Sequence, residues 1–141
     1  MTYYLIDYEN TGENGLEGLL DLQSSDKVVI FYSENADKMS FDLHQQLQEC
    51  DAVIEFQKIA VGKKNALDFQ LAAYLGYLMA KEENGQFCIV SKDLGYEVLL
   101  DFWQGKNIKR IDSISMGTER SIKGRDALEE KLRLLVGEED L

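Results

Sequence analysis

Hydrophobic and polar positions alternate in blocks along the chain, and these blocks predict strands and helices in turn. Short continuous apolar runs predict buried strands at residues 3–6, 28–32, 52–56 and 87–90, with a weaker one at 108–111. Apolar residues at helical spacing predict helices between them, at about residues 16–20, 36–49, 65–81 and 95–103. Leu128, Leu132 and Leu135 indicate a final helix.

Strands that alternate with helices predict a parallel sheet, because parallel strands are usually joined by a helical crossover. Continuous apolar strands also indicate a sheet that is covered on both faces. We therefore expect an α/β fold of three layers, with a central parallel sheet of about five strands and helices on both faces. The chain shows no internal repeat or low-complexity linker. We expect a single domain over residues 1–136 and an acidic tail over 137–141.

The composition narrows the class of protein. Hydrophobic residues make up 45% and charged residues 29% of 141 positions, an ordinary globular balance. The net charge of −11 argues against a protein that holds nucleic acid by general electrostatic attraction, although an enzyme needs only local basic contacts and metal ions. No apolar run is long enough to span a bilayer, and Asp7 and Glu9 interrupt the first one. We expect a soluble, cytoplasmic protein with no membrane partner.

Three aspartates occupy positions where a parallel sheet would gather them. Asp7 follows the first strand, Asp93 follows the fourth, and Asp68 lies in the first turn of the long helix. Sites in open parallel sheets form at the carboxyl ends of the strands, near the point where strand order reverses. Each aspartate alone also fits a turn or capping role. Carboxylates that converge without bases repel one another, so the set of three favours a bound divalent cation such as Mg²⁺ or Mn²⁺.

The residues around these aspartates resemble a known family. Ile6-Asp7-Tyr8-Glu9-Asn10 resembles the opening motif of NYN nucleases, a branch of the PIN-like superfamily. Asn65-Ala66-Leu67-Asp68 resembles their helical acidic motif, and Val90-Ser91-Lys92-Asp93 their Ser-x-Asp motif. The resemblance covers roughly residues 3–112 and implies a metal-dependent endoribonuclease, in which water activated on bound Mg²⁺ or Mn²⁺ attacks RNA. It also implies that Asp7, Asp68 and Asp93 bind the ions and that Asn10 positions the site.

One position departs from this pattern. The family has a second aspartate two residues after the first, and Gly95 stands there instead. Glu97 lies four residues after Asp93 and would share its side of a helix that begins there, so we predict Glu97 as a replacement metal ligand. Glu9 is a second candidate. The residues that we predict to contact substrate flank the acids or follow the second strand: Ser33, Asn35, Lys63, Lys64, Ser91 and Lys92.

Three functional classes fit these features to different degrees. We favour a nuclease acting on RNA, which we expect to be single-stranded. The glycine at position 95 favours the alternative of a catalytically weak or inactive PIN-like domain that binds RNA or a partner protein, and the resemblance also allows an antitoxin as partner. A receiver or phosphoryl-transfer domain fits less well, because receivers typically carry a Lys-Pro pair after the fifth strand and this chain has no proline.

Overall fold

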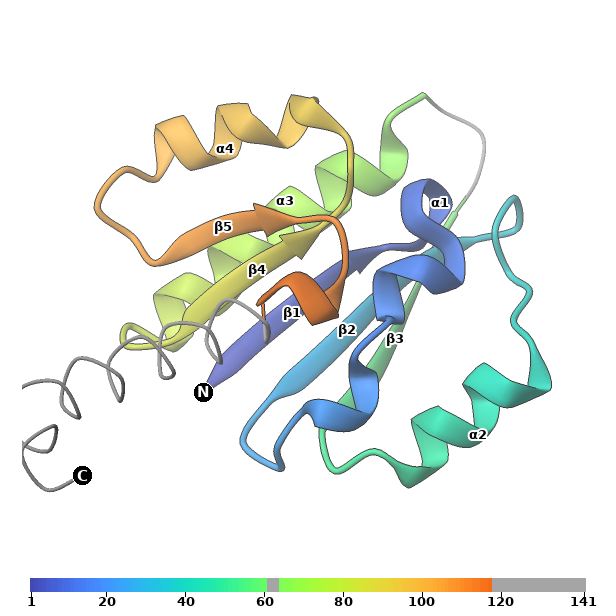
Figure 1. Cartoon of the computed structure of the whole chain (residues 1–141). Helices are drawn as coiled ribbons and strands as arrows, with labels where there is room; N and C mark the ends of the chain where they lie inside the picture. The colour runs from blue at the N-terminus through green and yellow to red at the C-terminus, as the bar shows by residue number, and fades with distance from the viewer. Residues whose placement is uncertain (61–63, 118–141) are drawn as a thin grey trace, which may run out of the picture.

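The computed structural model describes residues 1–60 and 64–117, and an all-parallel sheet lies at its centre. The order of the strands in the sheet is β3-β2-β1-β4-β5. The strands are β1 (Thr2–Asp7), β2 (Lys27–Ser33), β3 (Val53–Ile59), β4 (Gln86–Val90) and β5 (Ile108–Ile111). Figure 1 shows helices in front of this sheet and behind it. The predicted three-layer α/β fold is therefore confirmed.

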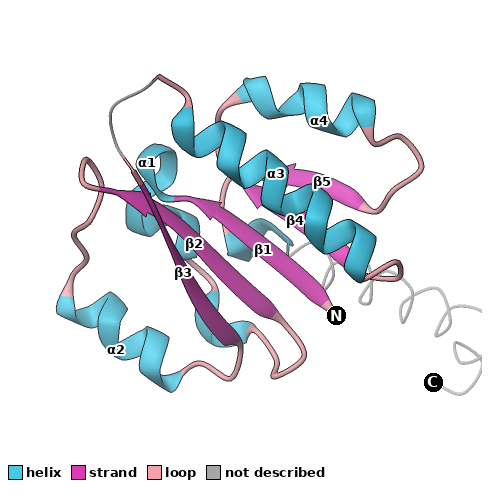
Figure 2. Cartoon of the chain, turned by 180° about the vertical axis from the view of Figure 1, so that it is seen from behind, coloured by secondary structure: helices cyan, strands magenta, loops and turns pink. Residues whose placement is uncertain are grey.

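The helices cover the two faces of the sheet in two groups. One face carries α1 (Tyr8–Thr11), α2 (Phe41–Glu49) and the 3-10 turns η1 (Gly12–Leu16) and η2 (Leu19–Asp21). The other face carries α3 (Ala66–Lys81) and α4 (Glu97–Phe102), and the 3-10 turn η3 (Leu94–Tyr96) precedes α4. Figure 2 shows α3 lying across the face of the sheet that is turned away in Figure 1.

The strands supply two cores because alternate side chains of a strand point to opposite faces of the sheet. In β1, Tyr4 and Ile6 are buried on the α2 face, whereas Tyr3 and Leu5 are buried on the α3 face. The buried residues of β2 and β4 divide between the two cores in the same way. Burial on both sides explains why these strands are continuous apolar runs in the sequence.

The order of the strands places a crevice next to β1. From β1 the chain builds β2 and β3 on one side, and α3 then carries it back to β4 on the other side. The carboxyl ends of β1 and β4 are therefore adjacent at the point where strand order reverses, where open α/β sheets bind ligands. The first turn of α3 lies at the same edge, because α3 follows the carboxyl end of β3.

Several elements differ from the predictions in their limits. The helix expected at 36–49 begins at Phe41, because the Ser40 hydroxyl caps it by accepting a hydrogen bond from the Leu43 amide at 3.1 Å. The 3-10 turns η1 and η2 replace the helix expected at 16–20, and the helix expected at 95–103 is divided into η3 and α4. The strand expected at 52–56 continues to Ile59, which is buried. The last helix and the acidic tail, with the domain limit at 136, lie outside the described residues.

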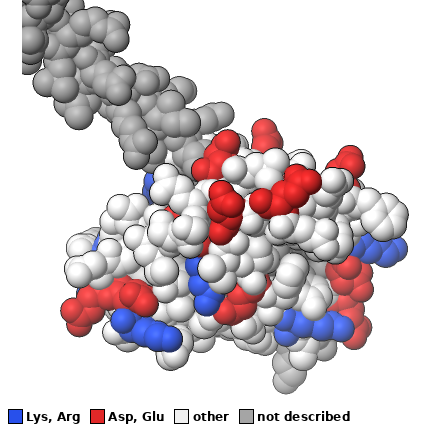
Figure 3. Space-filling model, turned by 90° about the horizontal axis from the view of Figure 1, so that it is seen from below, with Lys and Arg blue, Asp and Glu red and all other residues white. Residues whose placement is uncertain are grey.

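Charge is distributed over the surface without a broad basic area on the face shown in Figure 3. Acidic side chains lie there in separate groups, and basic side chains accompany some of them. Proteins that bind nucleic acid by general attraction instead carry basic patches or stripes. Within residues 1–60 and 64–117, no helix is long and apolar enough to cross a membrane.

Candidate functional site

A cavity opens at the carboxyl edge of the sheet, beside β1, β4 and the start of α3. Its volume is about 370 Å³, and the acidic side chains of Asp7, Glu9, Asp68 and Asp93 line it. Lys64 is the one basic residue among the lining residues that the structure describes. The cavity thus brings together the three aspartates on which the sequence analysis rested, and it adds Glu9.

Asp7 is the most buried of the four acids, at 4% exposed. Its Oδ2 accepts hydrogen bonds from the Ser91 hydroxyl at 3.2 Å and the Tyr96 hydroxyl at 3.1 Å. Its Oδ1 accepts one from the Asn10 backbone amide at 3.3 Å. Burial raises the pKa of the Asp7 carboxyl, and the charge of Asp68 adds to the rise, whereas the hydrogen bonds from Tyr96 and Ser91 oppose it. A cation beside Asp7 would therefore offset an unfavourable buried charge.

One tyrosine hydroxyl joins Asp7 to Asp68. Tyr96 is 3% exposed, and its hydroxyl lies 3.1 Å from Asp7 Oδ2 and 3.0 Å from Asp68 Oδ1. A phenol carries one proton, so the two carboxylates compete for a single donated hydrogen bond. Burial, followed by the charges of Asp7 and Asp68, raises the pKa of Tyr96 and keeps the hydroxyl protonated. Tyr96 thus holds two acids at a fixed spacing.

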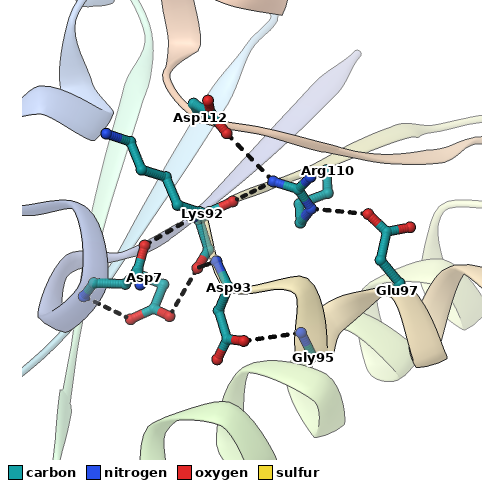
Figure 4. Close-up of polar contacts among 9 residues, drawn as sticks. Asp7, Lys92, Asp93, Gly95, Glu97, Arg110 and Asp112 are labelled. Carbon is teal, nitrogen blue, oxygen red and sulfur yellow. Dashed lines mark hydrogen bonds and ion pairs between the residues drawn. The ribbon is translucent and has the colours of Figure 1, made fainter.

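Hydrogen bonds to the backbone hold the loop after β4 against α1 (Figure 4). The Lys92 amide donates to Asn10 Oδ1 at 2.8 Å, and the Asp93 amide donates to the Ser91 hydroxyl at 3.1 Å. Asp93 caps η3 through Oδ1, which accepts a hydrogen bond from the Gly95 amide at 2.8 Å. Asn10 therefore fixes the position of the loop that carries Asp93, and the Asp93 Oδ2 takes no part in the cap.

Glu97 lies apart from the four acids. Its Oε1 accepts a hydrogen bond from Arg110 Nε at 2.9 Å, and Glu97 is not among the described residues that line the cavity. Figure 4 shows its side chain directed toward Arg110 and away from Asp93. The expectation that Asp93 and Glu97 share one side of a helix is wrong. Asp93 has an extended backbone, and a 3-10 turn rather than an α-helix separates the two residues.

The residues predicted to contact substrate fall into different environments. Ser33, Asn35 and Lys64 line the cavity. Ser91 is fully buried, which does not fit contact with a substrate, and its hydroxyl instead orients Asp7. The exposed Lys92 side chain extends away from Asp93 and does not line the cavity (Figure 4). Lys63 lies outside the described residues.

Two residues that shape the site, Tyr96 and Arg110, were not predicted from the sequence. Tyr96 was read as part of a helix, and the only signal for its role is its position directly after the glycine that replaces an aspartate. Arg110 had a clearer signal, because a charged residue inside a short apolar strand usually has a specific partner. Besides Glu97, Arg110 donates to the Ser91 carbonyl oxygen at 2.9 Å and to Asp112 at 3.3 Å. These bonds tie the end of β4 to β5 behind the cavity.

The donor atoms of the cavity suit a hard divalent cation. Its acidic residues offer carboxylate oxygens, which Mg²⁺ and Mn²⁺ prefer, and no His or Cys lines it within the described residues. In the described parts of the chain, no three Asp, Glu, His or Cys side chains lie close enough together to form a ready-made metal centre. Binding would therefore require the more exposed side chains of Asp93 and Glu9 to turn toward Asp7 and Asp68.

Comparison with protein families decides among the candidate classes. The family model of the PIN domain matches residues 1–111, which include all five strands and the acidic cavity. The chain belongs to the PIN domain family. No curated protein and no solved structure matches it. PIN domains are typically metal-dependent nucleases, so membership agrees with the acidic cavity and argues against a receiver or phosphoryl-transfer domain.

Proposed function

We propose that this PIN domain is an endoribonuclease of the NYN type that depends on Mg²⁺ or Mn²⁺. The observation that carries the proposal is the convergence of Asp7, Asp68 and Asp93 on one cavity at the switch point of the sheet. The NYN assignment is supported by the run Asp7-Tyr8-Glu9-Asn10, in which Asn10 fixes the loop that carries Asp93.

The three aspartates would hold the cation, each from a different element. Asp7 ends β1, Asp68 lies in the first turn of α3, and Asp93 follows β4, so a shift of any one element changes the shape of the site. A bound divalent ion would supply positive charge that acidifies water and stabilises the charge developing on a phosphodiester. Tyr96 and Ser91 contribute by orienting Asp7 so that its carboxylate faces the cavity edge shared with Asp68.

Glu9 is the better candidate for the fourth acid. Glu9 lines the cavity, whereas Glu97 forms an ion pair with Arg110. Glu9→Gln should therefore weaken Mn²⁺ binding and lower turnover. Glu97→Gln should leave Mn²⁺ affinity near that of the wild type, since its carboxylate is committed to Arg110. Equal losses in both variants would show that Glu97 leaves Arg110 to join the site.

The substrate would be a single strand of RNA. The cavity has the size of a small-ligand pocket, which suits one nucleotide of an extended strand better than a duplex. Asn35 offers a polar contact from the segment after β2, and Lys64 offers a phosphate contact from the segment before α3. Ser33 is buried, and its hydroxyl accepts a hydrogen bond from the Asn35 backbone amide at 3.3 Å, so Ser33 holds Asn35 in place.

A cleavage assay tests the proposal. Labelled single-stranded RNA is incubated with the wild type and with Asp7→Asn, Asp68→Asn and Asp93→Asn, in Mn²⁺ and in excess EDTA. Each substitution should lower cleavage by orders of magnitude, because an amide is a weaker ligand than a carboxylate, and EDTA should abolish it. Asp21→Asn, at an exposed position in η2, is the matched control and should cleave normally. Cleavage that persists in excess EDTA would contradict the metal mechanism.

A binding domain without catalysis is the second candidate, and Gly95 favours it. A β-carbon at this position would lie 3.1 Å from Asp93 Oδ1, so the tight turn leaves little room for the family's second aspartate. If purified protein binds RNA with Mn²⁺ present but never cleaves it, the three-acid site is a binding site only.

A further inference from the structure

A second pocket lies on the α2 face of the sheet, near the carboxyl ends of β2 and β3. Its volume is about 190 Å³, and its apolar walls come from Tyr8, Tyr32, Met39 and Phe56. We call it the aromatic pocket. Tyr8 is buried, whereas Phe56 and Met39 keep 50% and 37% of their surfaces exposed. The fold thus leaves aromatic surface open to solvent at the end of the sheet where the acidic cavity also lies.

Hydrogen bonds fix the segment that forms one wall of the aromatic pocket, the connection between β2 and α2 (Figure 1). The Tyr8 hydroxyl donates to the Lys38 carbonyl oxygen at 2.6 Å. The Ser40 hydroxyl and backbone amide donate to the Glu13 carboxylate at 2.7 and 2.8 Å. Met39 lies between these two attachments, so its side chain extends from a fixed stretch of backbone. The pocket is therefore largely preformed, as ligand pockets usually are.

A single tight turn separates the aromatic pocket from the acidic cavity. The Ala36 amide donates to the Ser33 carbonyl oxygen at 2.9 Å and closes this turn. Ser33 and Asn35 line the acidic cavity, whereas Ala36 lines the aromatic pocket. The two ends of such a turn lie less than about 7 Å apart. An RNA strand with one phosphate in the acidic cavity therefore has a neighbouring base within reach of the aromatic pocket.

We propose that the aromatic pocket binds a nucleobase of the RNA strand whose phosphate lies in the acidic cavity; RNA as the ligand rests on the proposed function. Every base has a flat apolar face that stacks on aromatic side chains. The rings of Tyr32 and Phe56 meet edge to face at 87°, with centroids 6.3 Å apart, and so form a corner that receives a flat ring. The polarizable thioether of Met39 also packs well against aromatic rings.

The size and charge of the aromatic pocket favour a base as its occupant. A volume of about 190 Å³ suits one ring system, because pockets for drug-sized ligands begin at about 300 Å³. Asp37 and Lys38 also line the pocket, one residue of each sign, and can accept and donate hydrogen bonds at the edge of a base. A base is uncharged, so the net charge of −11 does not repel it as it repels a phosphate. Stacking thus supplies affinity for RNA that general electrostatic attraction does not supply to this chain.

Methyl NMR of the full chain tests the proposal, because Met39 is the one of its four methionines that lines the aromatic pocket. Adenosine 5′-monophosphate is titrated in the presence of Mg²⁺, which is diamagnetic. The ring current of a base in the pocket should shift the Met39 methyl resonance, and the shift should saturate. Met79, buried against the other face of the sheet, should not respond. Ribose 5-phosphate has the same sugar and phosphate without the base, and it should leave Met39 unshifted.

Phe56→Ala removes the more exposed ring of the corner. It should weaken the response of Met39 to adenosine 5′-monophosphate by roughly tenfold, because base stacking on one aromatic side chain is worth about that much. Phe102→Ala is the matched control, since Phe102 is 74% exposed on α4, on the other face of the sheet, and this variant should bind as the wild type does. Thermal unfolding verifies that both variants are folded.

Three outcomes would overturn the inference: a Met39 resonance that does not respond, a response that ribose 5-phosphate reproduces, and a response that Phe56→Ala leaves unchanged. The titration needs no cleavage, so it separates this inference from the proposed function. If the wild type cleaves RNA but Met39 stays unshifted, the aromatic pocket is not a base site and the nuclease proposal stands. If Met39 responds to the base in a protein that never cleaves RNA, the base site stands and the nuclease proposal fails.

Discussion

The Tyr96 hydroxyl has one proton to offer, and the Asp7 and Asp68 carboxylates each accept from it within 3.1 Å. Such a group stabilises two acids only in part, because one of them always lacks a full hydrogen bond. The same hydroxyl keeps the pKa of Asp7 below the value that burial alone would produce. Tyr96 is thus a positioning residue whose loss should be visible in proton binding as well as in metal binding.

Tyr96→Phe should move the acid side of the pH profile for Mn²⁺ binding to higher pH. Removing the hydroxyl removes a hydrogen bond that lowers the pKa of Asp7, so protons compete with the cation up to a higher pH. Calorimetric titration of Mn²⁺ at several pH values measures the shift. Tyr77→Phe is the control, since Tyr77 is 57% exposed and its helix position lies away from the cavity.

The effect of Tyr96→Phe should also be measurable without metal, in the pH dependence of the free energy of unfolding. The folded pKa of Asp7 is already above its ordinary value, so its contribution to stability is present at low pH and is lost as pH rises through the folded pKa. Tyr96→Phe raises that pKa further, and the loss in free energy of unfolding should therefore be larger at neutral pH than under acid conditions. A loss that is equal at every pH would mean that Tyr96 contributes packing alone.

At the scale of elements, the sequence predicted the positions of the buried strands. It did not predict the helix limits that depend on a cap or on a 3-10 turn. Strands such as 108–111 were located correctly because their apolar side chains have two cores to fill. The helix expected from residue 36 begins later, since Ser40 caps it and also donates to Glu13 at 2.7 Å, a contact 27 residues away. Glu97 was misplaced for a similar reason: no hydrophobic period distinguishes a 3-10 turn from the first turn of an α-helix.

A long-range contact at Gly18 provides a prediction at this scale. Gly18 has φ +96°, and a β-carbon there would lie 2.7 Å from the Ser115 backbone nitrogen, whose amide donates to the Glu17 carbonyl oxygen. Gly18→Ala should lower the free energy of unfolding by about 3 kcal/mol, from backbone strain together with displacement of the Ser115 segment. Gly105→Ala shares a positive φ of +86° but meets no atom within 4 Å, so it should cost about 1 kcal/mol.

Urea denaturation of both glycine variants measures the difference. The two substitutions share the strain of a positive φ, so the gap between them reports the Gly18–Ser115 contact. Similar losses in the two proteins would show that the segment at 115 moves aside without cost.

At the scale of the whole molecule, the fold and the acidic cavity were both expected from the sequence, whereas the exposed apolar side chains of α3 were not. The apolar spacing predicted a helix at 65–81, but it records which positions are apolar and not which of them the rest of the chain covers. Leu71 and Phe69 look alike in that pattern, yet the structure buries the first and exposes the second. The apolar pattern therefore predicts the layers of the fold, whereas only the structure shows which apolar side chains stay exposed.

The charge of the whole molecule sets the last prediction, which concerns RNA binding. With a net charge of −11, general attraction to a polyanion is absent, and Lys64 is the basic residue that lines the described cavity. The affinity of the uncleaving Asp93→Asn variant for single-stranded RNA at fixed Mg²⁺ should therefore fall only shallowly with salt.

The slope of log affinity against log salt is about −0.7 for each phosphate neutralised on a single strand. Lys64→Ala should reduce the slope by about that amount, while Lys106→Ala, at an exposed position outside the cavity lining, should leave it unchanged. Fluorescence anisotropy across a salt series measures both slopes. A steep slope for the Asp93→Asn protein, near that of a protein with six or so phosphate contacts, would show that RNA follows a basic path other than the cavity edge at Lys64.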